Sequence, residues 1–377
     1  MKIAVVLRRF NRVGGIERYV SEVTERFVRK HEVHLITTWY DYKIDGVNVH
    51  KFPLPRWPFF VQIFLNAIKN TLAVKWLKGK YKFDVTYSQG SESFTADVVV
   101  MHSCHKAVVK QFKRERGWGY RLLKTFEPTS NIVFLIERYV LERGSRRIIA
   151  ISEVVKKEIL GCYNVPEDRI AVVYNGVNLD EFNPSNKIKF RKKIRQYYGL
   201  NEDDTVLLFV ANEFRRKGLE YVIRATRDLP KNVNVLVVGN DNPEPYKKIA
   251  NELGVGNRVI FSGHSRSVRE FYAASDIFVF PTVYEPFGLV ILEAMATGMP
   301  VITSRIAGAA EIMQGREDCL LLKNPDDIEE LREKIETLLS DKELMRAMGK
   351  NARKTAENHS WDRVVSDTLR VFDSIRL

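Results

Sequence analysis

Two carboxylates flank a Pro-Phe-Gly turn in the segment YEPFGLVILEAMATGMPV, residues 284–301. Glu285 precedes the turn, and seven residues separate it from Glu293, which lies in an apolar run with helical spacing. A regular helix would place the two acids roughly 12 Å apart along its axis. Carboxylates accept paired hydrogen bonds from neighbouring hydroxyl groups, so each acid is a candidate to hold a sugar.

The backbone between the two acids could bind an anion. Pro286 suits the first turn of a helix that we expect to run through Ala296. The amides of Phe287, Gly288 and Leu289 would then face a ligand at the helix N-terminus, where the helix dipole favours negative charge.

A nucleoside diphosphate sugar matches this layout, because its ribose and its hexose lie on either side of a diphosphate. Glu285 and Glu293 would each hold one sugar, and the helix amides would hold the phosphates. The structural alternative makes Glu293 the partner of a buried cation and Glu285 a cap.

Cations that could neutralise a diphosphate follow a predicted strand in VLLFVANEFRRKGLE, residues 206–220. We assign this role to Lys217 and Arg216, and Arg215 stays an alternative to Arg216. For each of the three, the other interpretation is a solvated surface charge.

Two further motifs also follow predicted strands. Gly14 and Gly15 precede a helix that begins near Ile16, so the backbone there could approach a ligand closely, although an ordinary turn is the alternative. His102 ends the apolar run VVVMH, and a neutral imidazole could form one hydrogen bond with a sugar hydroxyl. His105 lies a turn further on and is the other candidate.

Strands and helices alternate along the chain. The short apolar runs that predict strands are IAVVL, VHLIT, FDVTYS, ADVVVMH, RRIIAIS, DTVLLFV, NVNVLVVG, NRVIFSG, DIFVFP and MPVITS. We expect an α/β protein with two doubly wound, Rossmann-like domains, 1–180 and 181–360, that face a central cleft. A last helix over 361–377 could pack back on the first domain.

Composition is that of an ordinary globular protein, with 45% hydrophobic and 28% charged residues in 377. The three cysteines, Cys104, Cys162 and Cys319, form no metal-ligand cluster in the sequence and fit a reducing compartment. The apolar start is too short for a signal peptide, and no run approaches the roughly 18 residues of a membrane span. We therefore expect a cytoplasmic protein.

Positive charge is concentrated in the first half. Residues 1–180 carry 30 Lys and Arg against 18 Asp and Glu, whereas residues 181–377 carry 30 against 29. Residues 51–83, which include PRWPFF at 55–60, hold seven cations, no acid and several aromatic rings. This mixture suits an anionic membrane surface, although a helix with its apolar side on the core and solvated lysines is the alternative. No nucleic-acid-binding signature is present, so we expect no nucleic-acid partner.

The spacing of Glu285 and Glu293, with the wording EPFGL and EAMATGMPVI, resembles the retaining glycosyltransferases of family 4 (GT4), which have the GT-B fold. The resemblance extends over nearly the whole chain, through Gly14-Gly15, RRIIAISEVVKKEI, VVYNGVNLDEF and FRRKGLE. It implies that Glu285 contacts the donor sugar, Glu293 the ribose and Gly15 the diphosphate. It also implies that the first domain binds the acceptor and the second the donor.

The same resemblance implies that Lys217 binds the diphosphate and that His102 reaches the donor sugar. The common family wording has an arginine five residues before the lysine, where this chain has Asn212. Arg216 or Arg215 could replace it, as in the similar heptose glucosyltransferase branch of lipopolysaccharide synthesis.

The loop SRIAGAAEI, residues 304–312, differs slightly from a Gly-rich loop of the family. Gly308 and Glu311 match, whereas Ala309 replaces a second glycine. We expect this loop to border the donor phosphate or the base.

These features predict a retaining transferase without a metal or other cofactor. The chain has no Asp-x-Asp motif, so Lys217, Arg216 and helix amides would stabilise the leaving diphosphate. The resemblance implies a front-face displacement, with a UDP-, GDP- or ADP-hexose as donor and a glycan or glycolipid at the inner membrane face as acceptor. The alternatives are a GT-B epimerase or phosphorylase and a non-catalytic sugar-binding protein at the membrane surface.

Overall fold

The computed structural model describes residues 1–55, 57–115 and 127–376, so Arg56 of the predicted membrane segment lies outside the described residues. The chain forms two compact units. Unit 1 comprises Met1–Asn175 and Trp361–Leu377, and unit 2 comprises Gly176–Ser360. Residues 176–180, at the end of the predicted first domain, thus belong to unit 2.

Unit 1 is built on a seven-stranded sheet in the order β5-β3-β1-β6-β7-β8-β9, in which all neighbours are parallel. Its strands are β1 (Lys2–Val6), β3 (Glu32–Thr37), β5 (Val47–Lys51), β6 (Val85–Gln89), β7 (Ala96–Met101), β8 (Ser145–Ala150) and β9 (Ile170–Val172). A separate pair joins β2 (Arg9–Phe10) to β4 (Trp39–Tyr40). The strand order reverses between β1 and β6, which is the switch point where such sheets bind ligands.

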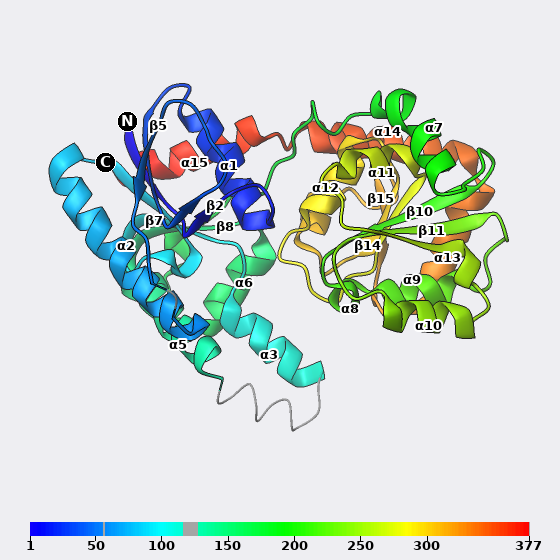
Figure 1. Ribbon diagram of the computed structural model, residues 1–377, viewed down its shortest axis with the longest axis horizontal. Coiled ribbons are helices and arrows are strands. Elements are labelled where there is room, and N and C mark those ends of the chain that lie inside the picture. Colours follow the sequence, from blue (N-terminus) through cyan, green and yellow to red (C-terminus); the bar gives the residue numbers. More distant parts are fainter. Residues whose placement is uncertain (56, 116–126, 377) are drawn as a thin grey trace. The chain divides into compact units, whose positions relative to one another are not determined.

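Helices cover both faces of this sheet (Figure 1). They are α1 (Gly15–Phe27), α2 (Phe59–Tyr81), α3 (His105–Glu115), α5 (Pro128–Tyr139), α6 (Glu153–Cys162) and α15 (Trp361–Asp373). The last helix, α15, packs on α1 within unit 1. Its buried Phe372 ring lies 5.8 Å from the ring of Phe27, and Trp361 lies 5.7 Å from Tyr19. The apolar spacing of the C-terminal residues therefore attaches the end of the chain to the first unit.

Unit 2 has a six-stranded parallel sheet in the order β12-β11-β10-β13-β14-β15. Its strands are β10 (Thr205–Val210), β11 (Val233–Val238), β12 (Val259–Gly263), β13 (Ile277–Phe280), β14 (Val301–Ser304) and β15 (Cys319–Leu322). Its helices are α7 (Asn186–Tyr197), α8 (Phe214–Lys217), α9 (Leu219–Thr226), α10 (Glu244–Glu252), α11 (Val268–Ala274), α12 (Leu289–Ala296), α13 (Ile328–Ser340) and α14 (Lys342–Glu357). This is the Rossmann order, with the switch point between β10 and β13.

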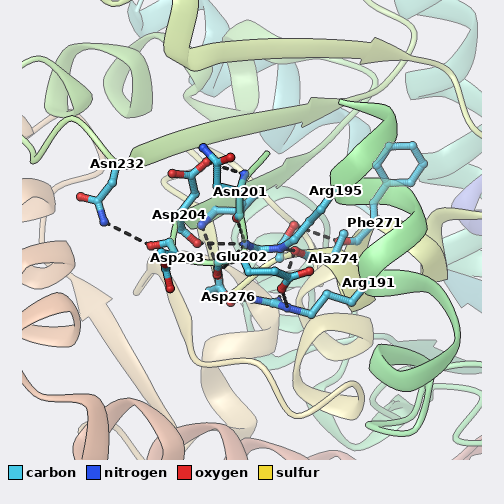
Figure 2. Close-up of polar contacts among 12 residues, drawn as sticks. Arg191, Arg195, Asn201, Glu202, Asp203, Asp204, Asn232, Phe271, Ala274 and Asp276 are labelled. Atoms are coloured by element: carbon cyan, nitrogen blue, oxygen red, sulfur yellow. Dashed lines mark hydrogen bonds and ion pairs between the residues drawn. The ribbon is translucent and has the colours of Figure 1, made fainter. Parts of the chain in front are cut away.

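A buried arginine links the segments that precede β10 and β13 in unit 2 (Figure 2). Arg195, on α7, is fully buried, and its Nη2 donates to Asp276 Oδ2 at 2.6 Å just before β13. Its other donors bind the carbonyl oxygens of Ala274 at 2.9 Å, Asn201 at 2.6 Å and Asp204 at 3.0 Å. Because the guanidinium is almost fully paired, its burial is compatible with a stable fold. The cluster lies at the opposite end of the strands from the candidate site.

Candidate functional site

Lys217 reaches the candidate site through a tight turn after β10. It ends α8, and Gly218 follows with φ of +79°, a left-handed conformation that favours glycine. A Cβ atom on Gly218 would lie 2.2 Å from the carbonyl oxygen of Pro281, which follows β13. Glycine therefore allows the turn after β10 to touch the turn after β13, so that both form the switch point of unit 2.

Lys217 forms a buried ion pair with Glu285. The lysine is 6% exposed, and its Nζ donates to Glu285 Oε2. The ammonium group also lies 3.5 Å from the carbonyl oxygen of Tyr284 and 5.5 Å from the ring centroid of Phe280. Burial lowers the pKa of Lys217, and the charge of Glu285 acts in the opposite direction.

Arg216 contacts the same turn. Its Nη1 donates to the carbonyl oxygen of Tyr284 at 2.9 Å, and its Nε donates to Glu213 at 3.0 Å. The backbone carbonyl of Arg216 accepts from the amide of Val283 at 3.0 Å. Arg215 is exposed, so the structure brings Arg216 rather than Arg215 next to Lys217 and Glu285.

The turn after β13 is not helical, which corrects the predicted helix start. Helix α12 begins at Leu289 rather than Pro286, and Gly288 precedes it with φ of +103°. Glu285 instead forms an isolated parallel bridge with Ala307. The 12 Å rise expected from a regular helix between the acids therefore does not apply, and Glu285 is not a helix cap.

The loop over 304–312 holds this turn in place. The amide of Gly308 donates to the carbonyl oxygen of Glu285 at 3.0 Å, and the amide of Ala309 donates to that of Phe287 at 2.8 Å. A Cβ atom on Gly308 would lie 2.1 Å from the carbonyl oxygen of Pro286. Glycine at 308 therefore allows the loop over 304–312 to touch the turn after β13. Ala309 is buried, and its Cβ atom is accommodated there.

Glu293 lies on the second turn of α12 and is buried, with 5% exposed. The Tyr272 hydroxyl, from α11, lies 3.0 Å both from Glu293 Oε2 and from the carbonyl oxygen of Val290. This contact orients the carboxylate from one side. Its proposed role toward a ribose, like the roles of the amides of Phe287, Gly288 and Leu289 toward phosphate, stays a prediction.

The remaining predicted residues belong to unit 1. Gly14 precedes α1 with an extended backbone, and Gly15 is the first residue of that helix. His102 follows β7, and its Nε2 lies 2.9 Å from Gln89 Oε1. In this orientation the Gln89 amide oxygen accepts, which corresponds to the tautomer with the proton on Nε2. His105 begins α3, and its ring lies 5.2 Å from that of Phe134.

Burial lowers the pKa of His102 to about 3. The ring is packed edge-on against Tyr19, with 4.9 Å between the centroids. The imidazole is therefore neutral at ordinary pH, as the prediction of a single hydrogen bond requires.

Sequence reasoning did not single out Tyr272, Tyr284 or the contact role of Gly308. Tyr272 and Glu293 are far apart in the chain, so spacing gives no signal for their contact. Gly308 had a signal, because a glycine inside an apolar loop often marks close backbone approach.

Two features are absent from the part of the chain that the structure describes. No group of three or more His, Cys, Asp and Glu side chains in these residues is arranged to hold a metal ion. None of their helices combines the length and the apolar character needed to span a bilayer.

Two family models cover most of the chain. The family described as Glycosyltransferase Family 4 matches residues 13–181, and the family described as Glycosyl transferases group 1 matches residues 190–355. The uncharacterized glycosyltransferase MJ1607 of Methanocaldococcus jannaschii is 31% identical over 395 residues, which cover 99% of this chain and 98% of the relative. The lipopolysaccharide glucosyltransferase WaaG of Escherichia coli K12 is 25% identical over 364 residues, with 95% and 94% covered.

Solved structures show the same fold. The crystal structure of WaaG superposes with a TM-score of 0.79 at 24% identity, covering 98% of this chain and 99% of WaaG. Anabaena HepE, crystallised in complex with UDP-glucose, gives 0.72 at 20% identity, with 100% and 99% covered. Two Rossmann-like units with these neighbours define a glycosyltransferase of the GT-B fold. The chain belongs to glycosyltransferase family 4.

Proposed function

We propose that this glycosyltransferase moves a hexose from a nucleoside diphosphate sugar, with retention and without a metal ion, to a glycan or glycolipid. The observation that carries the proposal is the buried pair of Lys217 and Glu285 at the switch point of unit 2, followed by the buried Glu293 on α12. The complex of HepE with UDP-glucose supports a nucleotide sugar as donor.

Each charged group has a part that suits its chemistry. Lys217 and Arg216 face the same turn, so their positive charges can neutralise the diphosphate. Glu285 and Glu293 offer carboxylate oxygens to the hydroxyl groups of the hexose and of the ribose. The roles predicted for Gly14, Gly15 and His102 toward the donor are part of the same proposal.

The proposed reaction is a front-face displacement at the anomeric carbon. The bond between that carbon and the phosphate oxygen breaks, and the pair of electrons leaves with the nucleoside diphosphate. The acceptor oxygen forms the new glycosidic bond on the same face, and its proton passes to the departing phosphate. Lys217 and Arg216 stabilise the negative charge that develops on this leaving group, which is the main source of rate enhancement that we propose.

A panel of UDP-, GDP- and ADP-sugars tests the donor by thermal shift, because a ligand that binds the native state raises the melting temperature. Release of nucleoside diphosphate is then measured with and without acceptor, and with and without EDTA. Turnover that needs acceptor and survives EDTA supports the proposal. Loss of activity with EDTA would refute metal independence, and conversion of the donor without acceptor would indicate an epimerase.

We further propose that α2 places the enzyme on the cytoplasmic face of an anionic membrane. Helix α2 packs a core side of apolar and amide residues against unit 1, whereas Phe64, Leu72 and Trp76 remain exposed along its outer side. The buried residues of the core side are Asn66, Ala67, Asn70, Ala73, Val74 and Leu77. Exposed lysines at 75, 78 and 80 adjoin them. This arrangement differs from the alternative of an apolar stripe fully covered by the core, and it matches an anionic surface that accepts rings and cations together.

Sedimentation with phosphatidylglycerol vesicles tests the membrane proposal. Leu72→Glu and Trp76→Glu should each weaken vesicle binding, because a carboxylate is repelled by the anionic surface and cannot enter its apolar boundary. Ile188→Glu is the matched control, since Ile188 is 90% exposed but lies in unit 2. Vesicle binding by Leu72→Glu and Trp76→Glu that is as strong as that of the wild type and of Ile188→Glu would overturn the proposal.

A further inference from the structure

Unit 1 has a polar cluster at its own switch point. Arg8 follows β1, Thr38 follows β3 and Glu92 follows β6, so the three residues lie at the carboxyl edge of the sheet. Asn66 and Lys69, on α2, complete the cluster. Open α/β sheets bind ligands at this edge, and the roles assigned above leave these residues unused.

Hydrogen bonds hold most of the cluster rigidly. Asn66 Nδ2 donates to Glu92 Oε2 at 2.6 Å, and Thr38 Oγ1 donates to Asn66 Oδ1 at 3.1 Å. Lys69 Nζ donates to Asn66 Oδ1 at 3.1 Å, to the carbonyl oxygen of Phe52 at 2.8 Å and to Thr38 Oγ1. Lys69 therefore uses all three of its N–H groups and adds only its charge to the surroundings.

The surroundings of Lys69 are short of negative charge. Burial lowers the pKa of Lys69 to about 8, Glu92 opposes this shift and Arg8 adds to it. Burial also raises the pKa of Glu92, against the charge of Arg8 and the hydrogen bond from Asn66. The cluster thus sets two cations, Arg8 and Lys69, against the single carboxylate of Glu92, so one positive charge remains for another anion to balance.

Arg8 is the member of the cluster with unused donors. Its carbonyl oxygen accepts from the amides of Thr38 and Trp39, both at 3.0 Å, which fixes its backbone. Its half-buried guanidinium stacks 5.5 Å from the ring centroid of Phe59 but makes no hydrogen bond or ion pair with the residues that the structure describes. A half-buried guanidinium usually has an acceptor, and its donors fit two oxygens of a phosphate or carboxylate.

We propose that Arg8, Phe59 and Glu92 form a subsite for a sugar that carries a phosphate or carboxylate group, and that this sugar belongs to the acceptor. Arg8 binds the anionic group, Glu92 accepts hydrogen bonds from hydroxyl groups, and the exposed ring of Phe59 covers an apolar face of the sugar. The assignment as acceptor rests on the proposed function, whereas the binding itself does not.

Titration calorimetry with glucose 6-phosphate and with glucuronate tests the subsite on the full chain. Arg8→Gln should weaken binding of at least one probe about 10- to 100-fold, because it removes a charged, two-point contact. Arg143→Gln is the matched control, since Arg143 is an exposed arginine of the same unit. The control and Lys217→Met, which removes a cation of unit 2, should each change the affinity less than twofold.

A second variant tests the carboxylate itself. Glu92→Gln keeps an oxygen that can accept from Asn66 but replaces the other carboxylate oxygen with an NH2 group, which cannot accept from a sugar hydroxyl, so it should weaken binding of glucose 6-phosphate. Equal or tighter binding of this probe by Glu92→Gln would contradict the contact assigned to Glu92.

Other outcomes overturn the subsite itself. These are no binding of either probe by the wild-type protein, equal affinity in wild type and Arg8→Gln, or an equal loss in Arg143→Gln. Loss of phosphatidylglycerol vesicle binding in Arg8→Gln, with unchanged affinity for both sugars, would replace the sugar by a lipid headgroup. A wild-type protein that transfers no sugar from any nucleotide donor would refute the proposed function and leave the calorimetric result standing.

Discussion

The buried pair of Lys217 and Glu285 predicts opposite patterns for stability and activity. The two side chains are 8% and 14% exposed, so either charge without the other would remain largely buried. Lys217→Met keeps the length of the side chain but leaves the buried carboxylate of Glu285 without its partner. Glu285→Gln likewise leaves the buried ammonium group of Lys217 without its partner. Removal of one partner of a buried pair costs about 3–5 kcal/mol. Because both side chains keep some exposure, we expect each variant to lose about 3 kcal/mol of stability.

The double variant, Lys217→Met with Glu285→Gln, should recover most of that stability. It leaves neither charge unpaired, and neutral replacement of a buried pair is often close to neutral in energy. Urea unfolding of the four proteins gives the coupling energy of the pair, which we expect to exceed about 2 kcal/mol. Activity should not recover, because the double variant lacks both the cation for the diphosphate and the carboxylate for the sugar.

Release of nucleoside diphosphate is therefore measured on the same four proteins. All three variants should be inactive, although the double variant is nearly as stable as the wild type. Wild-type turnover in Lys217→Met would refute the functional role of the lysine. Additive stability losses, with no recovery in the double variant, would refute the buried pair.

Three further predictions test separate parts of the structure. Glu293→Gln retains an oxygen that can accept from Tyr272, so it should fold normally but bind nucleotide about 10- to 100-fold more weakly by calorimetry; unchanged affinity would contradict a ribose contact. Arg195→Met should lower the free energy of unfolding by about 3–5 kcal/mol, because it removes one of the two arginines paired with Asp276 and the donors to several buried carbonyl groups. The folded variant should keep the wild-type KM for donor, and an altered KM would argue against a purely structural role. The pKa of His102 is about 3 in the native state, against about 6.5 in the unfolded state. Between these values the unfolded state binds more protons than the native state. The free energy of unfolding therefore falls as pH is lowered through this window, by at most about 1.4 kcal/mol per pH unit. His102→Gln should flatten this slope in urea unfolding between pH 4 and 7, and an unchanged slope would contradict the neutral histidine.

Local patterns account for most of the fold. Buried parallel strands require unbroken apolar runs, and the ten predicted runs correspond to β1, β3, β6, β7, β8 and β10 to β14. The strands without a prediction are short or lie at sheet edges, as β5, β9 and β15 do. Strand β5 (VNVHK) alternates apolar and polar residues and is partly exposed, whereas β9 (IAV) and β15 (CLLL) are apolar but only three and four residues long, too short to stand out as strands.

The sequence by itself determined the residues of the candidate site, because their types and their positions after strands are local properties. Lys217, Glu285 and Glu293 could be named from spacing and chemistry alone. It also determined that α12 ends near Ala296, since Gly298 and Pro300 follow at once.

Tertiary structure alone decided which of these residues meet. Lys217 and Glu285 are 68 positions apart, and their contact depends on β10 and β13 being neighbours in the sheet. The choice of Arg216 over Arg215 depends on which side of the one-turn helix α8 faces the carbonyl of Tyr284. The late start of α12 has the same kind of cause, because hydrogen bonds from the loop at 308 and 309 hold the preceding turn in a non-helical shape. Such contacts come from strand order and loop packing, which no local pattern encodes.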